Sequence, residues 1–325
     1  MTTPIAISCG DPNGIGPEIT VSAWKLMRQE LNFVLYTSFD YMKQRFPEVP
    51  MMKIDNPKNA HDVMQNGLPI FDIPFLTPYR PNEFNVDFSS ETIRSIEIAT
   101  RSCINGETKA LCTNPISKHI LTEKQNFKYT GHTDFLRYLT KSDNAVMMLA
   151  SDKLRVIPVT IHVSLVDATK LLSKQLIENT IEIVHDSLIK LFDIPVPRIA
   201  VSGLNPHAGE SGMFGLEELD IIVPSIQALQ TRGIDVTGPF SADSLFHEQA
   251  RKNYDVVVCM YHDQALIPIK TISFDEAVNI TLGLPFVRTS PDHGTAVDIA
   301  GKGLASPTSL INSIRMAEQL SGETV

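Results

Sequence analysis

Three histidines stand out because each follows a short apolar run at a point where a strand is expected to end. His162 follows "RVIPVTI", His207 comes four residues after "RIAVSG", and His262 follows "DVVVCMY". Such runs, rich in β-branched residues, are typical of buried strands. Neighbouring parallel strands bring their carboxyl ends to one edge of a sheet, where three neutral imidazoles can bind a divalent cation such as zinc or cobalt. The alternative for each is a histidine satisfied within the core.

A cation held by three imidazoles would keep its two positive charges, because the ligands add none. Such an ion is a Lewis acid that polarises an alcohol or carbonyl oxygen and stabilises an enolate. Asp263, next to His262, has two interpretations. It either orients a ligand by hydrogen bonding or caps the helix that would start there.

A second group of residues is suited to binding an anion. In "YTGHTDFLRYL", His132 and Thr133 stand at the start of an amphipathic segment, where unpaired backbone N–H groups accept phosphate or carboxylate. The alternative is an ordinary helix cap. Further along, Lys270, Asn279 and Arg288 supply two cations and an amide. Together they favour a phosphorylated or carboxylated small molecule as ligand.

The glycine-rich stretch "GDPNGIGPE", residues 10–18, links an expected strand to an expected helix. It matches neither the dinucleotide fingerprint nor the P-loop, because it lacks a third glycine at Ile19 and any Gly-Lys-Ser/Thr. Pro17 and Glu18 suit the first turn of a helix. The stretch is therefore either a purely structural turn or a turn that also borders a ligand.

The elements that must position these residues alternate along the chain. Apolar runs predict strands at 5–8, 33–37, 109–113, 145–150, 155–161, 198–203 and 255–260. Amphipathic spacing predicts helices at 17–30, 90–104, 116–123, 133–140, 174–191, 217–231, 241–252 and 307–320. This alternation predicts an α/β protein with a mostly parallel sheet.

Composition excludes several classes of function. The 325 residues suggest one large α/β unit or two domains, and the net charge of −9 argues against a nucleic-acid surface. No apolar stretch approaches the roughly 20 residues that cross a bilayer, and the N-terminal segment lacks a secretory pattern. The four cysteines are scattered, which favours reduced thiols and a cytoplasmic location.

Six motifs, spread in order between residues 10 and 307, give the chain a family resemblance. They are "GDPNGIGPE", "TGHTDFL", "NPHAGE", "GPFSADSLF", "YHDQALIPIK" and "PFVRTSPDHGTA". The set resembles the 4-hydroxythreonine-4-phosphate dehydrogenase family of vitamin B6 (pyridoxine) biosynthesis. In addition, "DHGTAVDIAGKGLASP" resembles the cofactor loop of the wider isocitrate/isopropylmalate dehydrogenase superfamily.

The resemblance implies a fold, a cofactor and an assembly. It implies a two-domain isocitrate/isopropylmalate dehydrogenase-like fold with helices on both faces of the sheet and a cleft between the domains. One domain would comprise residues 1–130 plus about 270–325, and the other about 131–269. The cofactor would be NAD, with NADP as the alternative, alongside one zinc, cobalt or magnesium ion per site. The family is a homodimer whose sites take residues from both subunits.

The resemblance also assigns roles to individual residues. The metal ligands would be His162, His207 and His262. The substrate contacts would be His132, Thr133, Lys270, Asn279 and Arg288. By analogy with the superfamily, the residues near the cofactor would be Gly294, Thr295, Ala296 and Asp298.

The implied reaction is oxidation of 4-phosphooxy-L-threonine by NAD, followed by loss of carbon dioxide to give 3-amino-2-oxopropyl phosphate. Asp243, Asp263 and Lys270 are alternative candidates for the base that accepts the proton. A related dehydrogenase acting on a phosphorylated sugar acid or a ring diol is the first alternative. A metal-dependent binding protein without catalysis is the second.

Overall fold

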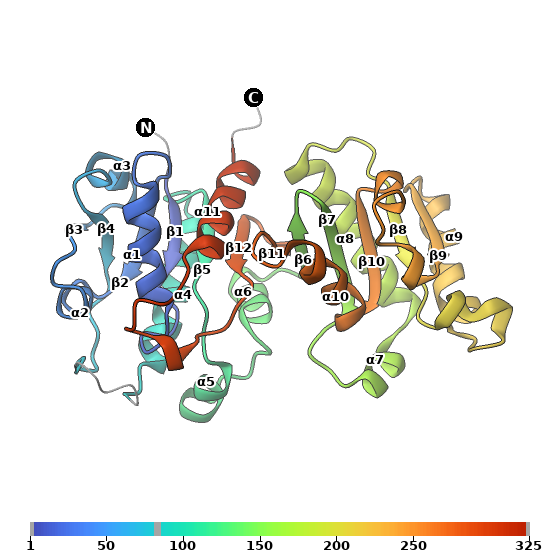
Figure 1. Cartoon of the computed structure of the whole chain (residues 1–325), viewed down its shortest axis with the longest axis horizontal. Helices are drawn as coiled ribbons and strands as arrows, with labels where there is room; N and C mark the ends of the chain where they lie inside the picture. Colours follow the sequence, from blue (N-terminus) through green and yellow to red (C-terminus); the bar gives the residue numbers. More distant parts are fainter. Residues whose placement is uncertain (1–2, 81–85, 323–325) are drawn as a thin grey trace. The chain divides into compact units, whose positions relative to one another are not determined.

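The structure of the chain, a computed structural model, describes residues 3–80 and 86–322 (Figure 1). The chain forms two compact units. Unit 1 comprises Met1–Asp143 and Leu284–Val325, and unit 2 comprises Asn144–Gly283. The sequence prediction puts the borders near residues 130 and 270. In the structure, helix α6 (His132–Thr140) belongs to unit 1 and strand β11 (Val278–Leu282) belongs to unit 2.

Unit 1 is built on a parallel sheet with strand order β3-β4-β2-β1-β5-β12. Its strands are β1 (Ile5–Ser8), β2 (Phe33–Thr37), β3 (Met51–Ile54), β4 (Leu68–Asp72), β5 (Ala110–Thr113) and β12 (Val287–Pro291). Every residue of β1, β2, β5 and β12 is buried. Continuous burial is expected where helices cover both faces of a parallel sheet.

Helices cover this sheet on both sides (Figure 1). The helices of unit 1 are α1 (Gly16–Met27), α2 (Phe39–Arg45), α3 (Ala60–Val63), α4 (Ser89–Ile104), α5 (Lys118–Gln125), α6 (His132–Thr140) and α11 (Thr308–Leu320). Helices α1 and α11 pack together, and α4 packs with α5 and α6. Apolar residues of α4, α5 and α6, such as Ile96, Leu121 and Phe135, join strand residues such as Val34 and Leu111 in one core cluster.

Unit 2 contains a mixed sheet with strand order β11-β6-β7-β10-β8-β9. Its strands are β6 (Val146–Ser151), β7 (Leu154–Thr160), β8 (Ile199–Ser202), β9 (Val236–Phe240), β10 (Val256–Tyr261) and β11 (Val278–Leu282). The pairs β11/β6 and β6/β7 are antiparallel, whereas β7, β10, β8 and β9 run parallel. Its helices are α7 (Leu165–Leu171), α8 (Lys174–Phe192), α9 (Val223–Thr231) and α10 (His262–Ser273).

The predicted α/β class with mostly parallel strands is confirmed, and each predicted strand is present to within one residue at either end. The helix predicted at 241–252 is wrong. That segment contains only the short 3-10 turns Ala242–Ser244 and Ala250–Asn253. Conversely, none of the predicted helix ranges covers α10, although a helix starting at Asp263 is one of the two interpretations given for that residue. Helix α10 carries Pro268 in its interior, a residue that normally argues against a helix, and it starts directly at the end of β10.

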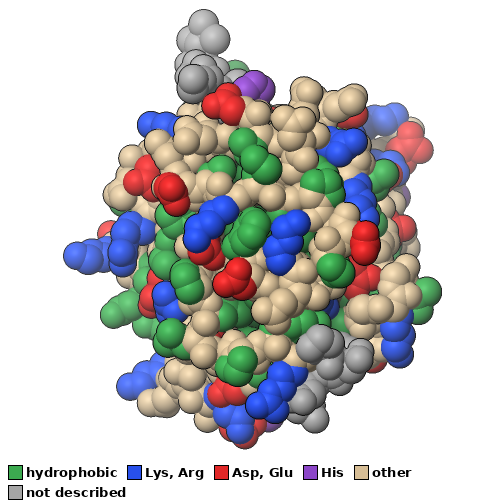
Figure 2. All heavy atoms as spheres, turned by 90° about the vertical axis from the view of Figure 1, so that its left-hand side faces the viewer, with side chains coloured by type: hydrophobic (Ala, Val, Ile, Leu, Met, Phe, Trp, Pro, Cys, Tyr) green, Lys and Arg blue, Asp and Glu red, His purple; other side chains and the backbone are tan. Residues whose placement is uncertain are grey.

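The surface of unit 1 carries charges of both signs. On the face seen in Figure 2, Lys and Arg side chains are interspersed with Asp and Glu side chains. Among the helices that the structure describes, none is both long and apolar enough to cross a membrane.

Candidate functional site

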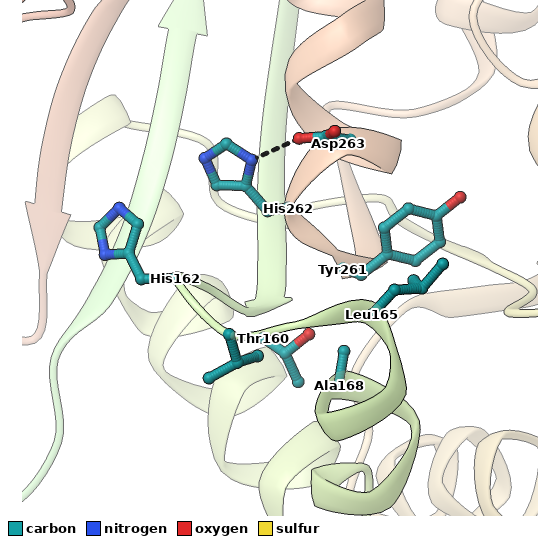
Figure 3. A pocket seen from close by; sticks show the side chains of 8 residues that line it. Thr160, His162, Leu165, Ala168, Tyr261, His262 and Asp263 are labelled. Atoms are coloured by element: carbon teal, nitrogen blue, oxygen red, sulfur yellow. Dashed lines mark hydrogen bonds and ion pairs between the residues drawn. The ribbon is translucent and has the colours of Figure 1, made fainter.

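Two of the three strand-end histidines lie side by side in unit 2. Strand β10 lies between β7 and β8, and all three run parallel, so their carboxyl ends share one edge of the sheet. His162 follows β7, and His262 is the first residue of α10 after β10. Their ring centroids are 5.9 Å apart. Both line a pocket that also contains Thr160 and Tyr261 (Figure 3).

The backbone at His162 adopts a conformation that L-residues rarely occupy. Its φ angle is +51°, in the left-handed region. Two residues later Ser164 caps α7, its hydroxyl accepting a hydrogen bond from the Asp167 N–H at 3.1 Å. The chain therefore turns sharply between β7 and α7, and the imidazole stays at the strand end. Backbone strain of this kind, about 1–3 kcal/mol for one residue, persists only where the surrounding structure holds it, and it often occurs at functional sites.

The ring of His262 is oriented by its neighbour Asp263. The Asp263 Oδ1 lies 2.7 Å from His262 Nδ1 (Figure 3). The N-cap of α10, Tyr261, receives no side-chain cap, so the structure favours the orienting role of Asp263 over a capping role. With Nδ1–H donated to the carboxylate, Nε2 presents its lone pair. Metal-binding histidines typically make this second hydrogen bond, so the donor set fits a metal site.

His207 lies in an unusual turn after β8. Residues 207–211 all have positive φ, between +42° and +79°, and four of the five are not glycine. A left-handed conformation costs roughly 1–2 kcal/mol for each such residue, so other contacts must hold this turn in place. The His207 side chain is exposed, with its ring centroid 6.1 Å from that of Phe214. Across residues 3–80 and 86–322, no three His, Cys, Asp or Glu side chains form a group able to hold a metal. A single chain therefore brings together His162 and His262 without His207.

The candidate bases occupy different places in unit 2. Asp243 is exposed in the 3-10 turn after β9, where it accepts a hydrogen bond from the Ser241 hydroxyl at 2.6 Å. It is not among the residues that line the histidine pocket. Lys270 is half-buried on α10, eight residues and therefore about 12 Å along the helix from His262. A continuous helix joins these two residues.

A buried cation lies in unit 1 on β12. The Arg288 side chain is 3% exposed and its Nη2 donates to Thr113 Oγ1 at 2.6 Å. Burial lowers the pKa of Arg288 to about 10, which still leaves the guanidinium charged at neutral pH. Burial, and after it the charge of Arg288, holds the pKa of His132 well below its ordinary value. The structure therefore brings the predicted residues His132 and Arg288 near each other, one neutral and one charged.

The polar atoms of this region fit a ligand. His132 Nε2 is buried and has no hydrogen-bond partner within the described part of the chain. His132 also begins α6, whose N-cap is Gly131 and receives no side-chain cap. First-turn N–H groups and a buried imidazole suit an anion. In unit 2, the predicted contact Asn279 lies on β11, and its buried Oδ1 likewise lacks a partner among the described residues.

The predicted cofactor residues follow β12 in unit 1. Gly294 and Asp298 are exposed, and Ala296 has a φ of +42° before the 3-10 turn Val297–Ile299. The glycine-rich turn at residues 10–18 packs against this segment, because the Ile15 N–H donates to the Thr295 carbonyl at 2.9 Å. This turn therefore supports the segment proposed to border the cofactor.

Sequence reasoning missed the carboxylate that braces the same segment. Glu18 is buried, and its two oxygens accept hydrogen bonds from the backbone N–H groups of Gly301 at 2.8 Å and Gly303 at 3.1 Å. Nearly the whole chain separates Glu18 from these glycines, and the local sequence assigned Glu18 only to a helix dipole. The glycines of "AGKG", both with positive φ, were the available signal for a tight loop.

Comparisons with known proteins agree with the resemblance found in the sequence. A family model described as "Pyridoxal phosphate biosynthetic protein PdxA" matches residues 24–317. The 4-hydroxythreonine-4-phosphate dehydrogenase of Roseobacter denitrificans is 45% identical over 100% of this chain and 99% of its own length.

Two solved structures extend the comparison. The 4-hydroxythreonine-4-phosphate dehydrogenase of Klebsiella pneumoniae superposes with a TM-score of 0.88 at 37% identity, covering 99% of both chains. A terephthalate 1,2-cis-dihydrodiol dehydrogenase of Burkholderia xenovorans gives a TM-score of 0.68 at 28% identity, covering 98% of both chains. The match to the family model and the full-length identity to the Roseobacter relative confirm the predicted resemblance: the chain belongs to the PdxA family of pyridoxal phosphate biosynthetic proteins.

Proposed function

We propose that this chain catalyses the NAD-dependent, divalent-metal-dependent oxidation of 4-phosphooxy-L-threonine to 2-amino-3-oxo-4-phosphooxybutanoate, on the path to pyridoxine 5'-phosphate. The keto acid then loses carbon dioxide and gives 3-amino-2-oxopropyl phosphate. Full-length relatives named for this dehydrogenase support the reaction. The observation that carries it is the pair of strand-end imidazoles, 5.9 Å apart, one of them oriented by a carboxylate.

Each half of the chemistry has residues suited to it. His162 and His262 of one chain, together with His207 of a second copy, would hold a zinc, cobalt or magnesium ion. The ion would act as a Lewis acid that polarises the oxygen of the substrate. NAD, with NADP as the alternative, would lie against Gly294, Thr295, Ala296 and Asp298 and accept the hydride. Arg288 and neutral His132 would bind the phosphate or carboxylate, with Thr133, Lys270 and Asn279 completing the substrate contacts.

The three candidate bases, Asp243, Asp263 and Lys270, all belong to unit 2. Asp263 is engaged with the ring of His262, which suits an orienting role. Asp243 and Lys270 are the other two candidates to accept the hydroxyl proton, and neither lines the histidine pocket. An aspartate acts as a base when it is ionised, whereas a lysine must first lose its own proton.

We further propose a homodimer in which His207 completes the site of the partner. Both segments that carry the exposed histidines also expose apolar side chains. They are Val163, Leu165 and Val166 beside His162, and Met213, Phe214, Leu216 and Leu219 beyond His207. Exposed apolar patches of this kind mark protein interfaces. Four free, buried cysteines support our proposal that the enzyme works in a reducing compartment, the cytoplasm.

The test is a steady-state assay of NAD reduction with 4-phosphooxy-L-threonine after removal of metal by a chelator. Adding back zinc, cobalt or magnesium should restore turnover.

The same assay with a cis-dihydrodiol and with a phosphorylated sugar acid separates the proposal from a related dehydrogenase. The 28% identity to a dihydrodiol dehydrogenase over 98% of both chains is the reason for including the diol. Turnover of the diol alone would replace the proposed substrate. Absence of any turnover, with NAD binding also absent in a fluorescence titration, would favour a non-catalytic binding protein.

Replacing Asp263 with alanine is expected to weaken zinc binding by about 10- to 100-fold, the usual effect of removing the group that orients a metal-binding histidine. The zinc affinity of Asp263→Asn should lie between those of Asp263→Ala and the wild type, because the asparagine amide oxygen still accepts a hydrogen bond from the His262 Nδ1–H. Competition with a chromophoric chelator measures the affinity. Asp186→Ala, which removes an exposed carboxylate on α8, is the matched control and should bind like the wild type. Equal affinities for Asp263→Ala and the control would remove Asp263 from the site.

Replacing Glu18 with glutamine is expected to raise KM for NAD by about 10-fold. The amide keeps only one acceptor oxygen for two backbone donors, and loss of a charge-assisted hydrogen bond is worth about 1.5–3 kcal/mol. KM for the phosphorylated substrate should change little. Steady-state kinetics with each substrate varied in turn provides the measurement, with the exposed Glu30→Gln as control. A parallel rise in both KM values would indicate a general loss of structure rather than a loosened cofactor segment.

A further inference from the structure

A buried carboxylate lies directly behind the turn that carries His207. Glu218 is 3% exposed. Its Oε1 accepts hydrogen bonds from the backbone N–H groups of Leu204 and Asn205, both at 2.8 Å. Its Oε2 accepts a third from the Asn205 side-chain amide at 2.9 Å. These three bonds satisfy a charge that would otherwise be costly to bury, and all of them go to the segment just before His207.

The carboxylate also fills a space that only glycine leaves open. A Cβ added to Gly203 would lie 3.1 Å from Glu218 Oε1, and one added to Gly209 would lie 2.6 Å from Oε2. Glu218 is thus enclosed between the two ends of the 203–209 segment. His207 lies in the middle of this segment, within the left-handed stretch 207–211.

A second buried side chain connects this segment to the strand end that carries His262. Gln264 is 8% exposed. Its Oε1 accepts from the Met260 N–H at 2.7 Å, and its Nε2 donates to the Gly203 carbonyl at 2.7 Å. One amide therefore ties the end of β10 to the beginning of the His207 segment, on the neighbouring strand β8.

We infer that Glu218 and Gln264 are positioning residues, which fix where His207 and His262 are held although neither side chain bonds to an imidazole. The inference rests on the proposed metal role of the two histidines. His207 is exposed, so packing does little to place its ring, and the backbone must do so. That backbone is in a conformation its non-glycine residues disfavour, and the buried hydrogen bonds of Glu218 and Gln264 are among those that tether the segment leading into it, beside backbone bonds such as Gly203 N–H to the Phe240 carbonyl. A ligand that is already in place binds metal more tightly than one that must be ordered first.

The test is the zinc affinity of full-length Glu218→Gln, stripped of metal and titrated against a chromophoric chelator. Glutamine keeps the volume, but with its oxygen on the two backbone N–H groups its NH₂ group replaces Oε2 and faces the Asn205 side-chain NH₂ group. Affinity should fall by about 10-fold, at the lower end of the loss expected when a group bonded directly to a metal-binding histidine is removed. Turnover should recover at high zinc, which would not happen for a variant lacking a ligand. The control is Glu182→Gln on α8, a half-buried carboxylate paired with Arg232, which should bind zinc like the wild type.

The outcomes separate this inference from the proposed function. If His262→Ala loses zinc but folded Glu218→Gln binds like the wild type, the positioning role is wrong while the metal site stands. If His262→Ala binds zinc normally, the proposed metal site itself fails. Should Glu218→Gln not fold, as judged by circular dichroism, Gln264→Met takes its place, because it removes one tether and leaves the carboxylate intact. Unchanged zinc affinity of Gln264→Met would then overturn the inference.

Discussion

His207→Ala is expected to bind zinc more weakly than any variant that removes only an orienting group, and so by more than about 100-fold. Turnover should fall by about 1000-fold or more, because losing several kcal/mol of charge stabilisation costs a factor of ten for each 1.4 kcal/mol. The fold should persist, since the side chain is exposed. Chelator competition, steady-state kinetics and circular dichroism provide the three measurements.

The same turn supplies the control for this variant. Glu210 is also exposed and also has a positive φ, so Glu210→Ala repeats the backbone perturbation without removing an imidazole. It should bind zinc like the wild type. Equal losses in the two variants would mean that the turn, and not the imidazole of His207, matters for the metal.

Mixed dimers test whether His207 acts across subunits. When His207→Ala and His262→Ala chains are combined, a shared site predicts that one of the two sites keeps a full set of histidines. About half of the wild-type activity per mixed dimer should then return. If each chain supplied all of its own ligands, both sites would lack one histidine and the mixture would stay inactive. The single-chain geometry, in which His162 and His262 are paired and no described group of three exists, favours the first result.

Arg288→Ala should raise KM for 4-phosphooxy-L-threonine by about 100-fold. Two charge-assisted hydrogen bonds to one phosphate are worth about 3 kcal/mol or more. KM for the dephosphorylated analogue should change much less, because an effect confined to the phosphorylated substrate reports binding of that group. Arg288→Lys keeps the charge but loses the planar, two-pronged guanidinium. Its KM for 4-phosphooxy-L-threonine should lie between those of the wild type and Arg288→Ala. The exposed Arg315→Ala on α11 is the control.

The effect of Arg288→Ala should not depend on pH near neutrality. In the wild type the pKa of Arg288 is about 10 and the pKa of His132 lies well below its ordinary value, so neither group titrates between about pH 6.5 and 8.5. Repeating the kinetics at both ends of this interval checks the point. Equal KM increases for the phosphorylated and dephosphorylated substrates would instead assign Arg288 to the stability of unit 1, where its bond to Thr113 is buried.

Much of this protein follows from its sequence read locally. Runs such as residues 5–8 and 255–260 are apolar because both faces of their strands are covered, and that property is encoded in contiguous residues. The apolar runs before His162, His207 and His262 predicted that these residues follow strand ends. The six motifs identified the family, which the comparisons confirm. The predicted helix ranges omit α10, which the tertiary structure tolerates despite Pro268, a local signal against a helix.

Only the tertiary structure decided which residues meet. Strand β10 enters the sheet between β7 and β8, which brings His262 beside His162, although His207 is closer to His162 in sequence and lies in the turn that follows β8. The tertiary structure likewise placed Arg288 near His132. It also gave the buried carboxylates of Glu18 and Glu218 their backbone N–H partners. Strand order and the burial of a charge depend on contacts between distant segments. A single sequence encodes those contacts only through the free energy of the whole fold, so no local pattern reveals them.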